Sequence, residues 1–169
     1  MTEPAPPEFP RPVDVNRLPG EGVYDLAATP AERAALARRF DLLALDRLEA
    51  QVRLTPLPGG LLRLSAALSA DLAQACVVTL EPVPGRIEDE FTLLYRPGVE
   101  DADKAVVLSG AAELVEPLPG GVLDIGEAVA QQLSLVLDPF PRAPGAAAES
   151  PSKALASPFA ALAKWKENN

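Results

Sequence analysis

Two stretches of the chain carry side chains that could do chemistry. Cys76 is the only cysteine and is followed by two valines, and Glu88-Asp89-Glu90 is the densest run of carboxylates inside a predicted strand. Thiolates are stabilised by nearby cations, and none lies close to Cys76 in sequence. We therefore interpret Cys76 as a small buried apolar residue in mid-strand rather than as a reactive thiol. Glu88 and Glu90 share a strand face, which we interpret as solvated rather than as a metal or acid–base site.

The composition excludes several kinds of catalytic site. The 169 residues contain no histidine and one cysteine, which excludes a Ser-His-Asp triad, a Cys-His dyad, a His-ligated zinc site and an intramolecular disulfide. The glycine-rich turn at Leu118–Gly121 lacks the Lys-Ser/Thr of a phosphate-binding loop. We predict that the protein is not an enzyme and uses no metal or cofactor. The N-terminus has no signal-peptide pattern and no apolar run is long enough to span a membrane, so we expect a cytoplasmic protein.

Charge is distributed unevenly along the chain. Residues 48–140 carry five bases and fourteen acids, a net charge of −9, whereas residues 141–169 carry four bases and two acids, a net charge of +2. This pattern argues against a wide basic footprint for nucleic acid and favours basic partners for the acidic part. Glu88, Asp89 and Glu90 are the candidate partner-binding face.

Two helices are predicted by their start signals. Thr29-Pro30-Ala31-Glu32 and Asp124-Ile125-Gly126-Glu127 both have the pattern of a capping box, and they predict helices at about 30–40 and 125–137. The apolar spacing turns two sets of residues inward: Ala34, Leu36, Ala37 and Phe40 in the first helix, and Ile125, Val129, Leu133, Val136 and Leu137 in the second. Arg33, Arg38 and Arg39 point outward from the first helix.

Between the helices the apolar residues alternate with a period of two from Leu48 onward, which predicts strands. Turns rich in proline and glycine occur at 56–60, 82–85 and 117–121, and they predict a meander of hairpins. The second hairpin would pair about 73–80 with 86–95, and the third would pair 112–116 with 122–123. Two short strands, 13–15 and 23–26, flank an earlier turn. A duplicated domain is disfavoured because the residues around the turns do not match.

The predicted fold class is therefore α+β: an antiparallel meander with two capped helices and a short tethered C-terminal helix. We divide the chain into a Pro-rich arm (1–12), a single domain (13–140), a flexible linker (141–157) and a terminal helix (158–169). Phe159, Leu162 and Trp165 form an apolar stripe on that last helix. The stripe either packs on the domain itself or docks on a partner, and both possibilities stay open.

Five stretches, in this order, resemble the YceD family, bacterial proteins linked to accumulation of 23S ribosomal RNA. They are residues 32–40, Cys76–Phe91, Leu123–Glu127, Leu137–Arg142 and Ser157–Ala163. The sequences of these stretches are similar to those of the alphaproteobacterial branch of the family. Many relatives have Cys-x-x-Cys where this chain has Cys76-Val77-Val78-Thr79, so a paired-cysteine metal role, if the family has one, is absent here.

The resemblance implies a non-enzymatic factor in biogenesis of the large ribosomal subunit, needed for accumulation or maturation of 23S RNA. From the residues we favour an acidic face that holds a ribosomal protein or assembly factor of the large subunit. One alternative is direct RNA contact in 23S precursor processing, through Arg33, Arg38, Arg39 and the basic tail. Another is a regulatory or small-molecule-binding domain, and a nuclease is the weakest interpretation because no spaced carboxylates resemble a metal-ligand cluster.

Overall fold

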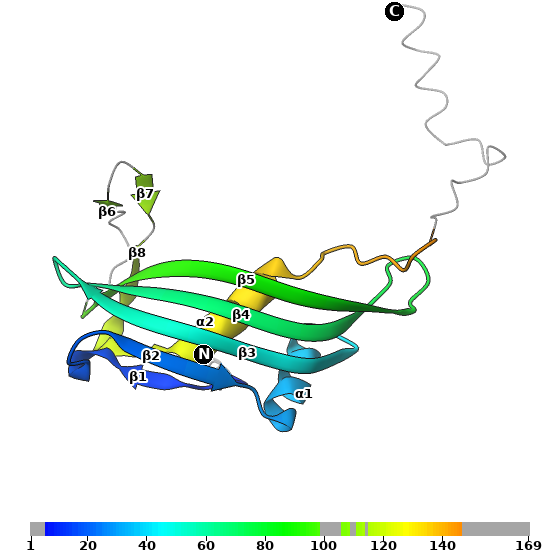
Figure 1. The fold of residues 1–169 in the computed structure, drawn as a ribbon, viewed down its shortest axis with the longest axis horizontal. Coiled ribbons are helices and arrows are strands. Elements are labelled where there is room, and N and C mark those ends of the chain that lie inside the picture. Colours follow the sequence, from blue (N-terminus) through cyan, green and yellow to red (C-terminus); the bar gives the residue numbers. More distant parts are fainter. Residues whose placement is uncertain (1–5, 99–105, 109–110, 114, 147–169) are drawn as a thin grey trace, which may run out of the picture.

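The computed structural model describes residues 6–98, 106–108, 111–113 and 115–146, and it has an α+β fold (Figure 1). Five strands form the main sheet in the order β2-β3-β4-β5-β8. They are β2 (Gly22–Ala27), β3 (Ala44–Leu57), β4 (Leu61–Ala75), β5 (Pro82–Pro97) and β8 (Val115–Leu118). Two further pairs are β1 (Pro12–Asp14) with β9 (Val122–Asp124), and β6 (Val106–Leu108) with β7 (Ala111–Glu113). The helices are α1 (Pro30–Arg39), α2 (Ile125–Val136) and the 3-10 turns η1 (Val15–Arg17) and η2 (Pro119–Gly121).

Strands β2 to β5 form the predicted antiparallel meander, but the third predicted hairpin is wrong. β8 pairs with β5 in parallel, with Leu94 opposite Val115, while β9 leaves the sheet and pairs with β1. The turn between β8 and β9 contains Gly120 and Gly121 at φ of 71° and 68°, a conformation that glycine adopts at little cost. This turn redirects the chain to a second sheet instead of closing a hairpin.

The second predicted hairpin exists, but its turn lies elsewhere. β4 is one strand of 15 residues and β5 one of 16, and residues 76–81 join them, whereas we predicted a strand at 73–80 and a turn at 82–85. Pro82 and Pro84 are paired with β4 inside β5. β8 covers only Leu94–Pro97 of the other side of β5, so both prolines lie on an edge, where the missing N–H costs no ladder bond.

Both predicted short strands are present, and they pair with different neighbours. Val13 of β1 lies opposite Leu123 of β9, while β2 pairs with β3. The segment that precedes β1, which we assigned to an N-terminal arm, places Phe9 at 0% exposure in the core. The remainder of that arm, residues 1–5, lies outside the described residues, as do residues 147–169 of the predicted linker and terminal helix.

Helix α1 begins as predicted. The Thr29 hydroxyl accepts from the Glu32 N–H and the Glu32 carboxylate accepts from the Thr29 N–H, so the capping box is complete. Leu36 is buried, and Ala37 and Phe40 pack against the core. The inward placement of Ala34 is wrong, because this residue is exposed. Residues advance about 100° each along a helix, so Ala34 lies about 160° around the axis from Leu36.

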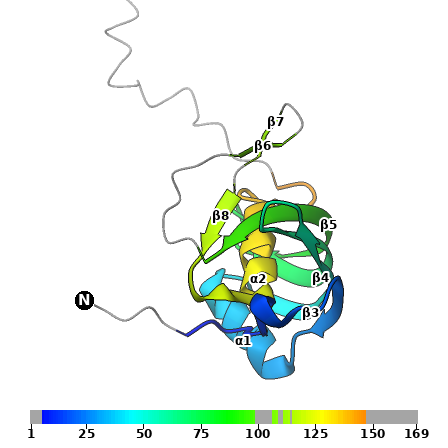
Figure 2. The same ribbon diagram turned by 90° about the vertical axis from the view of Figure 1, so that its left-hand side faces the viewer.

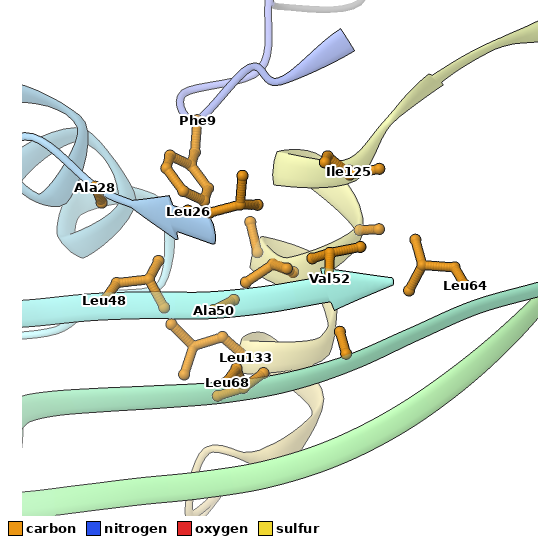
Figure 3. Packing of buried hydrophobic residues seen from close by; sticks show 14 of the residues in the cluster. Phe9, Leu26, Ala28, Leu48, Ala50, Val52, Leu64, Leu68, Ile125 and Leu133 are labelled. Atoms are coloured by element: carbon orange, nitrogen blue, oxygen red, sulfur yellow. The ribbon is translucent and has the colours of Figure 1, made fainter. Parts of the chain in front are cut away.

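Helix α2 packs across one face of the sheet, which curves around it (Figures 1 and 2). Asp124 caps the helix by accepting from the N–H groups of Gly126 and Glu127. The predicted stripe is confirmed: Ile125, Val129 and Leu133 are buried, and Val136 and Leu137 pack against the core. Figure 3 shows Ile125 and Leu133 of α2 facing side chains of β3 and β4, with Phe9 and Leu26 beside them. Among the described residues no helix packs on the opposite face, although Leu61, Leu94 and Val115 form a small buried cluster at one end of it.

Candidate functional site on the open face of the sheet

Alternation along the strands separates a buried and an exposed face. Ala50, Leu68 and their neighbours point toward α2, so the residues between them point away from it. We call this outward surface of β2 to β5 the open face. The strand register places on it the polar and charged side chains of Asp25, Arg47, Glu49, Gln51, Arg53, Thr55, Arg63, Ser65, Ser69, Asp71, Arg86, Glu88, Glu90 and Thr92, together with Ala67.

A groove of about 720 Å³ runs along the open face above β4. Ala67 and Ser69 of β4 form its floor, and longer side chains from the neighbouring strands stand on both sides. A second hollow of about 400 Å³ shares Gln51, Ala67 and Glu90 with it and extends toward Arg53 and Thr92. The groove forms because β4 carries small residues where β2, β3 and β5 carry long ones. We call it the acidic groove; the carboxylates that line it on the open face are those of Asp25, Glu49, Glu88 and Glu90.

Cations lie at both ends of the acidic groove: Arg53, beyond Gln51, pairs with Glu21, and Arg47 and Arg86 lie at the opposite end. Arg47 lies 3.0 Å from Glu49 and 2.8 Å from Asp71, and Arg86 lies 2.7 Å from Glu88. Asp25, by contrast, has a neutral partner: its carboxylate accepts a hydrogen bond from the Gln51 amide at 2.9 Å. Within the described part of the chain, no ion pair involves Asp25 or Glu90. The middle of the groove therefore keeps a negative charge.

The predicted carboxylate run is divided between the two faces of the sheet. Glu88 and Glu90 line the acidic groove with their carboxylates on the open face, whereas Asp89 turns toward α2 and accepts from the Gln132 amide at 2.8 Å. The structure instead places Asp25 and Glu49 in the lining of the same groove, on the other side of β4 from Glu88 and Glu90. Sequence reasoning missed these two residues. The available signal was the alternation along the sequence, which places the polar residues 49, 51 and 53 on one face of their strand.

The three arginines of α1 have different surroundings. Arg39 bonds to Glu8 at 2.8 Å and to Glu127 at 2.8 Å, and these hydrogen bonds, that to Glu127 above all, raise its pKa. Arg33 donates to the carbonyl of Ala28 at 3.1 Å. Arg38 is exposed, and it lines a hollow of about 390 Å³ beside Arg33. Of the three, Arg38 is the one most open to an external ligand.

Cys76 is buried as predicted, but it is not in mid-strand. It begins the connection between β4 and β5, and its Sγ accepts from the N–H groups of Val78 at 3.4 Å, Thr79 at 3.4 Å and Ala143 at 3.3 Å. These donors, the N–H of Ala143 first among them, lower the pKa of the thiol to about 6. Sequence reasoning looked for a cation and missed the backbone amides, which only the folded turn brings together.

The chain after α2 packs on this same turn before it leaves the described structure. The Val77 N–H donates to the carbonyl of Pro141 at 2.9 Å, and the Gln74 amide donates to the carbonyl of Asp138 at 2.9 Å. Phe159, Leu162 and Trp165 lie outside the described residues. Residues 141–146 thus connect the predicted tail to one end of the sheet.

Neither a metal centre nor a membrane-spanning helix is found in the described part of the chain. No group of three or more Cys, Asp or Glu side chains is arranged to hold a metal ion among residues 6–98 and 115–146. No helix in these ranges is long and apolar enough to cross a membrane. The surface features with chemical character are thus the acidic groove, the arginines of α1 and the turn at Cys76.

The fold and its surface define a small α+β protein with one helix-covered and one open, acidic sheet face. Residues 64–165 match the family model described as large ribosomal RNA subunit accumulation protein YceD. The match covers more than half of the chain, and the chain belongs to the YceD family. It includes Cys76, Glu88, Glu90 and α2, but not α1 or β3. No curated protein and no solved structure matched the chain. Family membership supports a role in the accumulation of large-subunit ribosomal RNA.

Proposed function

We propose that this protein is a non-catalytic, cytoplasmic factor in large-subunit biogenesis that holds a basic protein partner in its acidic groove. The observation that carries the proposal is that two carboxylates, those of Asp25 and Glu90, line one groove and form no ion pair with any residue that the structure describes. The net charge of −9 over residues 48–140 adds a wider negative field. Such a field speeds the encounter with a positively charged partner and selects against acidic ones.

The shape of the groove favours an extended segment of the partner. Ala67 and Ser69 line the groove with small side chains, and the adjoining hollow, which shares Ala67, reaches Ser65 of the same strand. A lysine or arginine side chain from such a segment could place its alkyl part on the small residues and its charge beside Asp25 or Glu90. The partner in this proposal is a ribosomal protein or assembly factor of the large subunit that carries basic extended segments.

A charge-reversal experiment tests the proposal. The variant Glu88→Lys with Glu90→Lys changes the acidic groove, and the control Glu81→Lys with Glu116→Lys makes the same change of net charge at exposed positions outside both the groove and the hollow at α1. We expect affinity capture from lysate of the parent bacterium to retain the partner after ribonuclease treatment. The groove variant should bind the purified partner more slowly and with a weaker dependence on salt, while the control should behave as the natural protein.

Direct RNA binding is the second candidate, and the exposure of Arg38 beside the hollow at α1 favours it. It predicts the opposite results in both experiments. Ribonuclease should abolish capture, and lysines in the acidic groove should strengthen retention on RNA. Arg38→Glu should weaken that retention. Arg39→Glu is a poor test, because Arg39 is held by Glu8 and Glu127 and its loss would disturb the fold.

A further inference from the structure

Large apolar side chains are exposed at the end of the sheet where β4 turns into β5. Val77, Val78 and Leu80 are 48%, 37% and 76% exposed, and Phe140, which follows α2, is 69% exposed. We call these four residues the apolar tip. Hydrogen bonds bring the two segments together, since Val77 N–H donates to the carbonyl of Pro141. Figure 1 shows the segment after α2 running to this end of β4 and β5.

The backbone beneath the apolar tip is well fixed. Cys76 N–H donates to Glu81 at 2.8 Å, Leu80 N–H donates to Cys76 at 2.9 Å, and the thiol accepts from Ala143. The turn and the segment after α2 therefore form one unit. The exposure of these apolar groups is a property of an ordered surface rather than of a loose loop.

Leu80 is unusual both in its backbone conformation and in its exposure. Its φ is +61°, a left-handed conformation that costs energy for a residue with a Cβ and favours glycine or asparagine. The side chain placed there is a leucine that is three-quarters exposed. A strained backbone that presents an apolar group to solvent is typical of a binding surface.

The chain itself supplies a segment that fits this surface. The described structure ends at Ala146, three residues after Ala143, which is bonded to Cys76 at the tip. Beyond it, residues 147–157 lead to Phe159, Leu162 and Trp165. A flexible chain of that length has an end-to-end distance of about 18 Å. Tethering over such a distance gives an effective concentration in the millimolar range, so a weak apolar contact would be populated.

The charges at the two sides also complement each other. Lys164 and Lys166 flank Trp165, while two carboxylates, Glu81 and Asp138, and one cation, Arg142, are exposed next to the residues of the apolar tip. We propose that residues 158–165 dock on the apolar tip of their own domain, with Phe159, Leu162 and Trp165 covering Val77, Val78, Leu80 and Phe140. This contact is independent of the acidic groove.

Trp165 allows a direct test because it is the only tryptophan of the chain. In the full-length protein we expect its fluorescence emission to be blue-shifted, and its quenching by acrylamide reduced, relative to a peptide of residues 150–169. Leu80→Gly and Val78→Ser should each shift the emission to the red and restore quenching. The control Val122→Ser, at a 53% exposed valine of β9 near the opposite end of β5, should not.

Leu80→Gly also separates loss of docking from loss of folding. Glycine relieves the positive φ, so the circular-dichroism spectrum should be retained while the emission shifts. Peptide-like emission in the natural protein, or the same emission in Leu80→Gly and the natural protein, would overturn the proposal. A blue shift that appears only as protein concentration rises would also overturn it, because the contact would then join two copies of the chain.

Discussion

Arg39 and Glu127 join the last turn of α1 to the first turn of α2 through two hydrogen bonds of 2.9 and 2.8 Å. The arrangement is favourable at both ends, since a cation stabilises a helix C-terminus and an anion a helix N-terminus. Glu8 accepts from the same guanidinium at 2.8 Å. One side chain thus connects the N-terminal segment and both helices on the covered side of the sheet.

We expect Arg39→Met to lower the free energy of unfolding by about 1–2 kcal/mol, because a two-pronged and partly buried ion pair is lost. Glu127→Gln should cost a similar amount, and the double variant should cost less than the sum of the two. Urea unfolding measures all three. The control Arg38→Met, on the same helix but at an arginine that forms no ion pair within the described part of the chain, should stay within about 0.5 kcal/mol of the natural protein. Strict additivity of Arg39→Met and Glu127→Gln would show that the pair contributes nothing.

The helices could be predicted from sequence because their signals are local. Thr29 and Glu32 cap α1 as their spacing indicates, and Asp124 caps α2. Strand ends were harder to predict, since Pro82 and Pro84 end a strand only where their nitrogens face a neighbour. Whether β5 has a neighbour there depends on β8, which arrives from more than 20 residues away in sequence.

The acidic groove was predictable only in part, for a similar reason. The position of Glu88 and Glu90 on one face follows from alternation alone. Whether Asp25 and Glu49 line the same groove depends on the register of four strands, and the turns at 58–60 and 76–81 set only the pairings of β3 with β4 and of β4 with β5. The amide donors around Cys76 depend on Ala143, which lies 67 positions away.

The pair formed by Glu32 and Arg11 predicts a pH dependence of stability. The Arg11 guanidinium, 2.7 Å from the carboxylate, is the main cause that lowers the pKa of Glu32 to about 2. A carboxyl whose pKa is lower in the folded state stabilises the protein above its unfolded pKa, and the contribution is lost as the pH falls. We expect about 2 kcal/mol of stability to disappear between about pH 4.5 and pH 2.

Urea unfolding of the natural protein and of Glu32→Gln over this pH range gives the measurement. The difference between them should be largest at neutral pH and vanish near pH 2. Arg11→Met should remove most of the same difference, since Arg11 is the cause of the shift. A difference that is constant with pH would contradict the role of this ion pair.

The Cys76 thiol predicts a second pH dependence of stability, between about pH 6 and pH 9. The N–H groups of Ala143, Thr79 and Val78 lower the pKa of the thiol to about 6, from an ordinary value of 9.0. Since the folded pKa is the lower one, stability should rise as the pH increases from 6 to 9. Cys76→Ser should remove this rise, because a serine hydroxyl does not ionise in that range. The midpoint of urea unfolding under reducing conditions checks it, and an equal rise in both proteins would exclude the thiolate as its source.

Gly126 predicts a steric effect at the start of α2. A Cβ at this position would lie 1.9 Å from the carbonyl oxygen of Phe9, so the N-terminal segment can pack closely only against glycine. We expect Gly126→Ala to cost about 1–3 kcal/mol of stability. At Gly85 the nearest atom to an added Cβ is Leu72 Cδ1 at 3.8 Å, an ordinary contact. Gly85→Ala should therefore change the melting temperature little, and an equal loss in both variants would contradict the close approach at Gly126.

The role in the ribosome predicts a phenotype that separates the two sides of the molecule. Family membership leads us to expect that a strain lacking this protein has less 23S RNA relative to 16S RNA and accumulates free large-subunit precursors. The gene for the natural protein should restore the ratio. If the acidic groove holds the partner, Glu88→Lys with Glu90→Lys should fail to restore it, while the charge-matched control Glu81→Lys with Glu116→Lys and the α1 variant Arg38→Glu should succeed. Quantifying both ribosomal RNAs and sucrose-gradient profiles measures the outcome. Restoration by the groove variant but not by Arg38→Glu would favour direct RNA contact at α1, and a normal 23S ratio in the deletion strain would remove the proposed role in ribosome biogenesis.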